Sequence, residues 1–213
     1  MKLRGWALTR WISVALLAMT ALVLAGAGTG EPGVRMLIRA TARSSALLFL
    51  TAFLARPARQ LWRSDVTAYL LKNRRYFGVS MAVSHFIHGC AIGRLITSFP
   101  GAYTLQAQTI VFGGLGFVFI ALMATTSSDA AFAKLGRKRW TLLHRTGVWY
   151  LWFIFAFTFI PDPSRGWDAL HALFVSAFGA APLVRAAAHW KTRRRKQVAT
   201  AAGGASPRAS EPG

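Results

Sequence analysis

The chain has 213 residues, of which 54% are hydrophobic and 15% are charged, with 26 Lys and Arg against 6 Asp and Glu. Mean hydropathy is +0.39, and the cations lie between apolar runs instead of gathering in one soluble patch. This pattern excludes an ordinary soluble nucleic-acid-binding protein and favours a multi-pass membrane protein. A single cysteine excludes an internal disulfide and a CxxC site.

The N-terminal region begins with residues 1–10, a short basic segment that we expect to be cytoplasmic. Residues 11–30 carry no charge, and a run of this length matches the thickness of a bilayer core. We therefore favour a first transmembrane helix. The small residues at 25–27 also fit a cleavage site, so removal of residues 1–27 as a secretory signal is the alternative.

The second and third predicted spans enclose a basic loop. Residues 44–55 are short for a span and cross only if the arginines at both ends reach the interfaces. Cations then follow one another through residues 56–75. The third span is uncharged from Tyr76 to Gly93, about 27 Å at 1.5 Å per residue.

Three further apolar runs complete the predicted membrane part, at residues 109–126, 146–160 and 169–184. In the first of these, Gly113, Gly114 and Gly116 are expected to let neighbouring helices approach closely. Residues 127–145 are polar and basic, and predict a loop. Residues 191–213 form a basic and then low-complexity tail, which we expect to be cytoplasmic and too polar to fold by itself.

Six spans would place alternate loops on opposite sides of the membrane. Most cations then lie on the side that holds both termini, and the other side keeps only Arg35, Arg39, Arg43, Arg94 and Arg165. Cytoplasmic loops are enriched in Lys and Arg, so both termini should be cytoplasmic. The sequence therefore predicts an all-α integral membrane protein, with a six-transmembrane-helix bundle over residues 11–190.

Four of the five histidines lie in or beside predicted spans: His85, His88, His144 and His171. An imidazole that faces hydrocarbon is unfavourable, so a histidine within a span is a candidate functional residue. Neutral imidazole is also a good axial ligand for haem iron. The alternative is that each ring bonds to a backbone or hydroxyl group of a neighbouring helix. His189 precedes the basic tail and is predicted to lie at the interface.

Depth restricts which of these histidines could share one iron. Counted by helix rise, His88 lies about 20 Å and His85 about 15 Å from the predicted cytoplasmic edge. His144 lies about 8 Å from that edge, and His171 about 6 Å from the outer edge. His88 with His171 therefore matches in depth, and His85 with His144 is a looser match. His88 and His144 differ too much in depth for a single iron.

The positions of the acidic residues and the absence of a nucleotide-binding motif narrow the range of possible functions further. No carboxylate lies in the middle of a predicted span, which argues against a proton pump or cation transporter. The sequence shows no phosphate-binding glycine loop between a strand and a helix, so we expect no flavin or nicotinamide cofactor of its own. An electron donor would therefore be a separate partner.

Two motifs resemble the ferric-reductase-like transmembrane domain family. The sequence Arg-Arg-Tyr-Phe-Gly at 74–78, followed by His88, resembles the third helix of that family. The segment at 134–144, which ends in Trp-Thr-Leu-Leu-His, resembles the entry to its fifth helix, and residues 42–56 look like its short second span. The chain looks most like the haem-binding membrane subunit of the bacterial periplasmic methionine-sulfoxide-reductase system.

The resemblance implies a six-helix bundle that holds one or two b-type haems and passes electrons across the membrane. By motif position, His88 and His144 would be haem ligands. The family has a further histidine where this chain has Phe157, and His171 is our candidate replacement. His85 would be an alternative ligand or would pack against the haem.

Partners and the remaining site residues follow from the same resemblance. It implies the inner membrane of a bacterium, a cytoplasmic flavoprotein or quinol as electron donor, and an outer or periplasmic protein as acceptor. Arg74, Arg75 and Arg145 are placed to pair with haem propionates or with lipid phosphate, and anchoring at the cytoplasmic face is the alternative use of these cations. The chain would then be an oxidoreductase membrane subunit that needs a separate reductase. The alternative function is a non-catalytic scaffold or assembly protein without haem.

Overall fold

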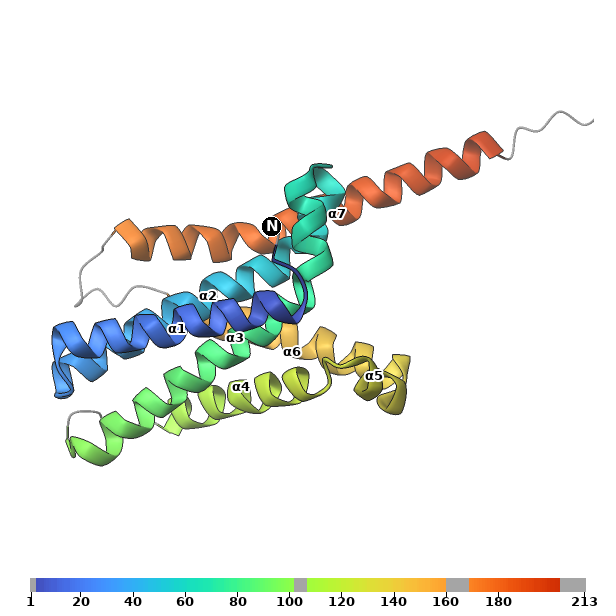
Figure 1. Ribbon diagram of the computed structural model, residues 1–213. Coiled ribbons are helices and arrows are strands. Elements are labelled where there is room, and N and C mark those ends of the chain that lie inside the picture. Colours follow the sequence, from blue (N-terminus) through green and yellow to red (C-terminus); the bar gives the residue numbers. More distant parts are fainter. Residues whose placement is uncertain (1–2, 102–106, 160–168, 204–213) are drawn as a thin grey trace, which may run out of the picture.

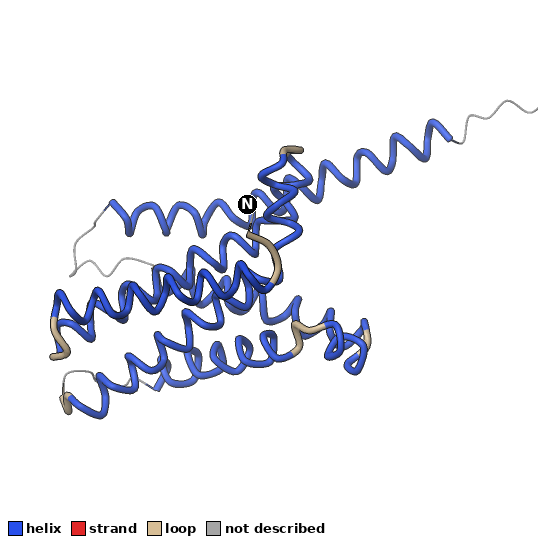
Figure 2. Tube along the Cα trace, viewed as in Figure 1, coloured by secondary structure: helices blue, strands red, loops and turns tan. Residues whose placement is uncertain are grey.

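The computed structural model describes residues 3–101, 107–159 and 169–203, and this part of the chain contains helices and no strand (Figures 1 and 2). The helices are α1 (Trp6–Ala27), α2 (Glu31–Leu61), α3 (Asp65–Ser98), α4 (Ala107–Thr125), α5 (Asp129–Leu135), α6 (Arg137–Thr158) and α7 (Ala169–Gly203). The all-α prediction is thus confirmed. Residues 1–2, residue 160 of the predicted fifth span and residues 204–213 of the tail lie outside the described residues.

Several helices have the length and composition needed to cross a bilayer. α1, α2, α3 and residues Ala169–Thr200 of α7 meet this criterion individually. α4 from Thr109 meets it together with α5, although the two are bent by 105°. α6 does not meet it, and four cations lie among its first nine residues. The described chain therefore has four or five helices that could span a membrane.

The helices run side by side, and their connections alternate between two ends of the bundle (Figure 1). The turns that follow α1 and α3 lie at one end. The turn between α2 and α3 lies at the other end, together with α5 and the start of α6. We call this the basic end, because the cations of residues 56–75 and 134–145 belong to it. The second half of α7 continues beyond the bundle at the basic end.

Hydroxyl groups join α2 to α3 near the middle of both helices. The Oγ of Ser84 lies 2.8 Å from the Oγ of Ser44 and 2.9 Å from that of Ser45. Ser45 and Ser84 are fully buried. Small hydroxyl residues allow two helices to approach closely and bond to each other, which is a common device in membrane bundles.

Phenylalanines form the centre of the core between α2, α6 and α7. The ring of Phe178, which is 1% exposed, stacks 6.2 Å from Phe49 and 5.8 Å from Phe155. Phe159 and Phe174 continue the stack, with centroids 4.7 Å apart. Offset-stacked rings add to the burial of their area, so this cluster aligns α6 and α7 against α2.

Three segments outside the predicted spans are helical. The turn residues at 28–33 predict a loop, but α2 already begins at Glu31, with a proline in its first turn, a favoured position, and continues without a break into residues 44–55. The polar segment 127–145 is mostly helical, as α5 and the start of α6. The basic residues after Lys191 are also helical, since α7 continues to Gly203.

Neighbouring helices approach closely not at Gly113, Gly114 and Gly116, as the sequence had predicted, but at another glycine. A Cβ atom at Gly113 or Gly114 would have no neighbour within 4 Å, and one at Gly116 would make only ordinary contacts. A Cβ at Gly147 of α6, in contrast, would lie 2.5 Å from Sδ of Met123 in α4. The glycine that lets α4 and α6 pack closely is therefore on α6.

Candidate functional site

His88 is held by two groups of α2. Its Nδ1 lies 3.2 Å from the carbonyl oxygen of Ile38 and 3.1 Å from Oγ1 of Thr41. The Thr41 hydroxyl donates to the carbonyl of Leu37 at 2.7 Å, so its oxygen is left to accept. Both neighbours of Nδ1 are then acceptors, which places the proton on Nδ1 and a lone pair on Nε2.

This arrangement fits an axial haem ligand. A ligating histidine normally donates its other ring N–H to a carbonyl or carboxylate, which fixes its orientation and tautomer. His88 has that second contact already, and no hydrogen bond to its Nε2 occurs among the described residues. The residues around His88 therefore fit coordination of haem iron through Nε2.

His85 lies beside His88 on the same face of α3. Its ring is 5.1 Å from that of His88, 4.6 Å from Phe117 and 5.8 Å from Phe155. Its Nδ1 is buried and has no hydrogen-bond partner in the described part of the chain. A buried polar atom left unpaired costs about 1–3 kcal/mol, so this ring points to a missing partner next to His88.

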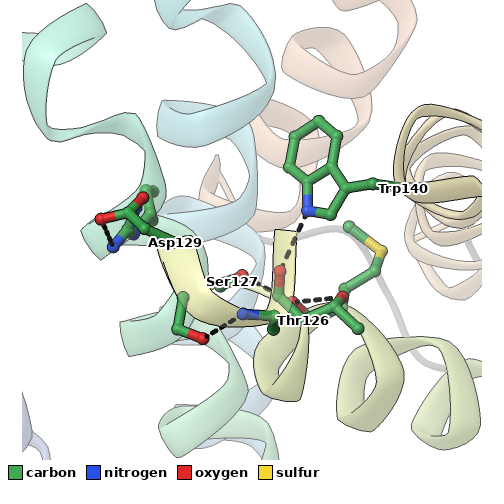
Figure 3. A network of polar contacts seen from close by, with 8 residues as sticks. Thr126, Ser127, Asp129 and Trp140 are labelled. Carbon is green, nitrogen blue, oxygen red and sulfur yellow. Dashed lines mark hydrogen bonds and ion pairs between the residues drawn. The ribbon is translucent and has the colours of Figure 1, made fainter. Parts of the chain in front are cut away.

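His144 is bonded differently from His88. Its Nε2 lies 3.1 Å from Oγ1 of Thr126, whose hydroxyl donates to the carbonyl of Leu122 at 2.6 Å. The threonine oxygen therefore accepts from an Nε2–H. The ring also stacks on Trp140 at 4.0 Å. Figure 3 shows the indole N–H of Trp140, which donates to the carbonyl of Thr126 at 2.9 Å. To bind iron through Nε2, His144 would have to leave Thr126.

His171 also uses its Nε2 within the protein. This atom lies 2.8 Å from the carbonyl oxygen of Phe159, at the end of α6, and a carbonyl can only accept. The contact ties α7 to α6. Phe157, where the resembling family has a histidine, is 65% exposed and directed away from the core. No contact among the described residues joins His88 to His144 or to His171.

A cavity of about 1280 Å³ opens at the basic end of the bundle. This volume exceeds the range of about 300–1,000 Å³ that is usual for small-molecule sites. His144 and the three predicted arginines, Arg74, Arg75 and Arg145, all lie on its wall. The structure thus brings four of the predicted site residues to one cavity, and His85, His88 and His171 lie elsewhere.

Arginines of four helices, α2, α3, α6 and α7, lie on this wall. Arg74 donates from Nε to the carbonyl of Ala52 at 3.0 Å, and Arg185 donates from Nη1 to that of Phe53, also at 3.0 Å. The Arg185 guanidinium also lies over the rings of Phe53, at 4.3 Å, and Trp149, at 5.2 Å. Arg56 and Arg74 are both close enough to Arg185 to repel its charge.

One carboxylate lies on the wall of the cavity. Asp129, at the start of α5, accepts from Nη1 of Arg75 at 2.6 Å and from Nη2 at 3.4 Å. The hydrogen bond from Arg75, together with its charge, holds the pKa of Asp129 below its usual value. Arg75 Nε is buried and has no partner among the described residues.

Several residues of these sites were not found from the sequence. Ile38, Thr41 and Thr126 contact the histidines through a carbonyl or a hydroxyl, and no motif marks such groups. Arg185 was assigned to the cytoplasmic flank of the last span. The presence of Pro57 in a helix could have indicated it, because a proline leaves a carbonyl that needs an external donor.

The described residues include no group of three or more His, Cys, Asp and Glu side chains placed to hold a bare metal ion. A haem needs only one or two side chains, so this finding concerns other metal sites. In comparisons with models of known protein families, with curated proteins and with solved structures, nothing matches the chain.

Proposed function

We propose that the chain is a membrane electron-transfer subunit that holds b-type haem in a bundle of six spans, with both termini in the cytoplasm. The observation that carries the proposal is His88, whose Nδ1 bonds to Ile38 and Thr41 while its Nε2 keeps a lone pair. The unpaired Nδ1 of the adjacent His85 supports a bound group in the same place. Haem b, when bound, supplies one-electron transfer through its iron.

The roles of the protein residues follow from their contacts. Ile38 and Thr41 orient His88 and fix its tautomer, and the Phe117 and Phe155 rings beside His85 keep water away. The second axial ligand would be His171, which matches His88 in predicted depth, or His144, which matches the family motif. Each would have to exchange its present bond to a protein oxygen for iron.

Electron supply and delivery require other proteins. A cytoplasmic flavoprotein or quinol would be the donor at the basic end, and an outer or periplasmic protein the acceptor. Arg74, Arg75 and Arg145 on the cavity wall have the charge to hold haem propionates if a haem lies near His144. The bacterial inner membrane is the proposed location.

A non-catalytic scaffold without haem is the second candidate. Two observations favour it: the Nε2 atoms of His144 and His171 are already bonded to Thr126 and Phe159, and Phe157 faces outward. In that case these histidines serve only to join helices. The two functions differ in whether the purified protein contains haem, which is directly measurable.

The test is the visible spectrum of the full-length protein purified from cells supplied with haem. We expect sharp reduced bands of low-spin b-type haem, and His88→Ala should lose most of the haem. His85→Ala is the matched control on the same helix and should retain it, with at most a shifted potential. Loss of haem in His171→Ala or in His144→Ala identifies the second ligand. Wild-type haem content and an unaltered spectrum in His88→Ala would overturn the proposal.

A further inference from the structure

The arginine cluster around Pro57 has no anion to balance its charge within the described part of the chain. Arg56, Arg74 and Arg185 come from α2, α3 and α7 and lie on the wall of one cavity, where their like charges repel. The carboxylate of Asp129 on the same cavity wall is already bonded to Arg75. Like charges this close are unfavourable in a low-dielectric region unless an anion lies between them.

The cavity is amphipathic. Its cationic part continues onto Lys72 and Lys196, and its other walls are apolar, with Phe49, Met81 and Ile120 among them. A small inorganic anion would leave these apolar walls uncovered. A ligand with an anionic head and a hydrocarbon body would cover both parts at once.

A second feature points to a ligand in the same cavity. Arg75 lies on the wall, and its Nε is a buried donor without a partner among the described residues. Arg74 and Arg185 each use one nitrogen on a carbonyl of α2, and a guanidinium has five N–H donors in all. Several donors therefore remain for oxygen atoms of a bound group.

We propose that this cavity binds the phosphate headgroup of an anionic phospholipid, with Arg56, Arg74 and Arg185 as the phosphate-binding residues and the apolar wall in contact with an acyl chain. Clusters of cations beside membrane-spanning helices attract anionic lipids, and arginine can bind phosphate oxygens with two donors at once. The site would be independent of haem at His88, so it holds whether or not the protein is an electron-transfer subunit.

The test is native mass spectrometry of the full-length protein in a non-ionic detergent, titrated with phosphatidylglycerol, phosphatidylcholine or inorganic phosphate. We expect one phosphatidylglycerol to bind about tenfold more tightly than phosphatidylcholine, because only the former carries a net negative charge. Inorganic phosphate should bind far more weakly than either. Equal binding of the two lipids, or phosphate binding as strong as that of phosphatidylglycerol, would overturn the proposal.

Matched variants locate the site. Arg56→Gln and Arg185→Gln should each weaken phosphatidylglycerol binding about fivefold to tenfold, because each removes one charge from the cluster. Arg195→Gln removes an exposed charge from the same helix as Arg185, outside the cavity, and should have no such effect. An equal loss in all three variants would show only general attraction to charge and would refute the site.

Haem content is measured on the same samples. The proposal requires that phosphatidylglycerol binding does not decline as haem loading rises. A decline in proportion to haem would mean that propionates occupy the arginine cluster, and would overturn the proposal while supporting the haem function. Loss of haem in His88→Ala without loss of lipid would leave the lipid site intact.

Discussion

Arg185 of α7 donates a hydrogen bond at 3.0 Å to the carbonyl of Phe53, the group that would bond to the backbone N–H of residue 57 if that residue were not proline. Proline has no such N–H, so the carbonyl has no partner within α2. In hydrocarbon an unsatisfied carbonyl is costly. The bond therefore satisfies α2 and holds α7 against it.

Replacement of Arg185 by an apolar residue should destabilise the bundle through this carbonyl. Arg185→Leu is expected to lower the free energy of unfolding by about 1–3 kcal/mol, the cost of one unsatisfied buried acceptor. Thermal unfolding of the purified protein in detergent measures the change. Arg185→Gln retains a donor and should lose less.

A double variant separates this mechanism from lost packing. Pro57→Ala restores an N–H at residue 57, so in the Arg185→Leu background it should recover part of the lost stability. The two substitutions should be non-additive in a double-mutant cycle. Additive effects would show that the loss comes from packing against Phe53 and Trp149 instead.

The pair of Arg75 and Asp129 should make the position of α5 sensitive to pH. The pKa of Asp129 is lowered by Arg75, so the pair stabilises the fold above the usual carboxyl pKa and is lost as pH falls through the lowered value. The protection of residues 129–135 against hydrogen exchange, corrected at each pH for the intrinsic exchange rate, should therefore be lower below the pKa of Asp129 than at neutral pH.

The control for this effect is Asp129→Asn. This variant should show low protection at both pH values, and high salt should reduce the difference in the wild type because the pair is exposed to water. If the wild type and the variant had the same pH dependence, another group would have to be responsible.

Gly147 should be intolerant of a side chain. A Cβ there meets Met123 and also lies 3.1 Å from the ring of Phe119, so Gly147→Leu should force α4 and α6 apart. We expect a loss of about 1–3 kcal/mol in thermal unfolding, as for other overpacked sites. Gly114→Leu, at a glycine with open space around it, should leave stability unchanged or slightly raised. Equal losses would contradict close packing at Gly147.

The six-span arrangement predicts which introduced cysteines a reagent outside the cell can reach. In a Cys90→Ser background, single cysteines are introduced by Gly28→Cys, Arg63→Cys, Gly101→Cys, Ser127→Cys, Ser164→Cys and Thr200→Cys. A membrane-impermeant maleimide added to intact cells should label the first, third and fifth of these. Labelling of both Ser127→Cys and Ser164→Cys, or of neither, would mean that α6 does not cross.

Composition and periodic charge determined the class of the protein. Long uncharged runs can only be buried in hydrocarbon or in a core, so most of each predicted segment lies in a helix, although residues 28–30, 126 and 159 fall just beyond helix ends. Helix ends were less predictable, because arginine is compatible with a helix and also with an interface. Residues 31–43 therefore became part of α2, although Arg35, Arg39 and Arg43 were expected on the outer side, before the short second span.

Only the tertiary structure decided what the histidines and arginines contact. The sequence places His88, His144 and His171 in helices, but whether an Nε2 is free depends on which hydroxyl or carbonyl a neighbouring helix presents to each ring. Thr41 and Ile38 are far from His88 in sequence, and Arg185 is far from Phe53. Such contacts follow from helix packing, and packing depends on the whole set of side chains at an interface, such as the phenylalanine stack between α2, α6 and α7.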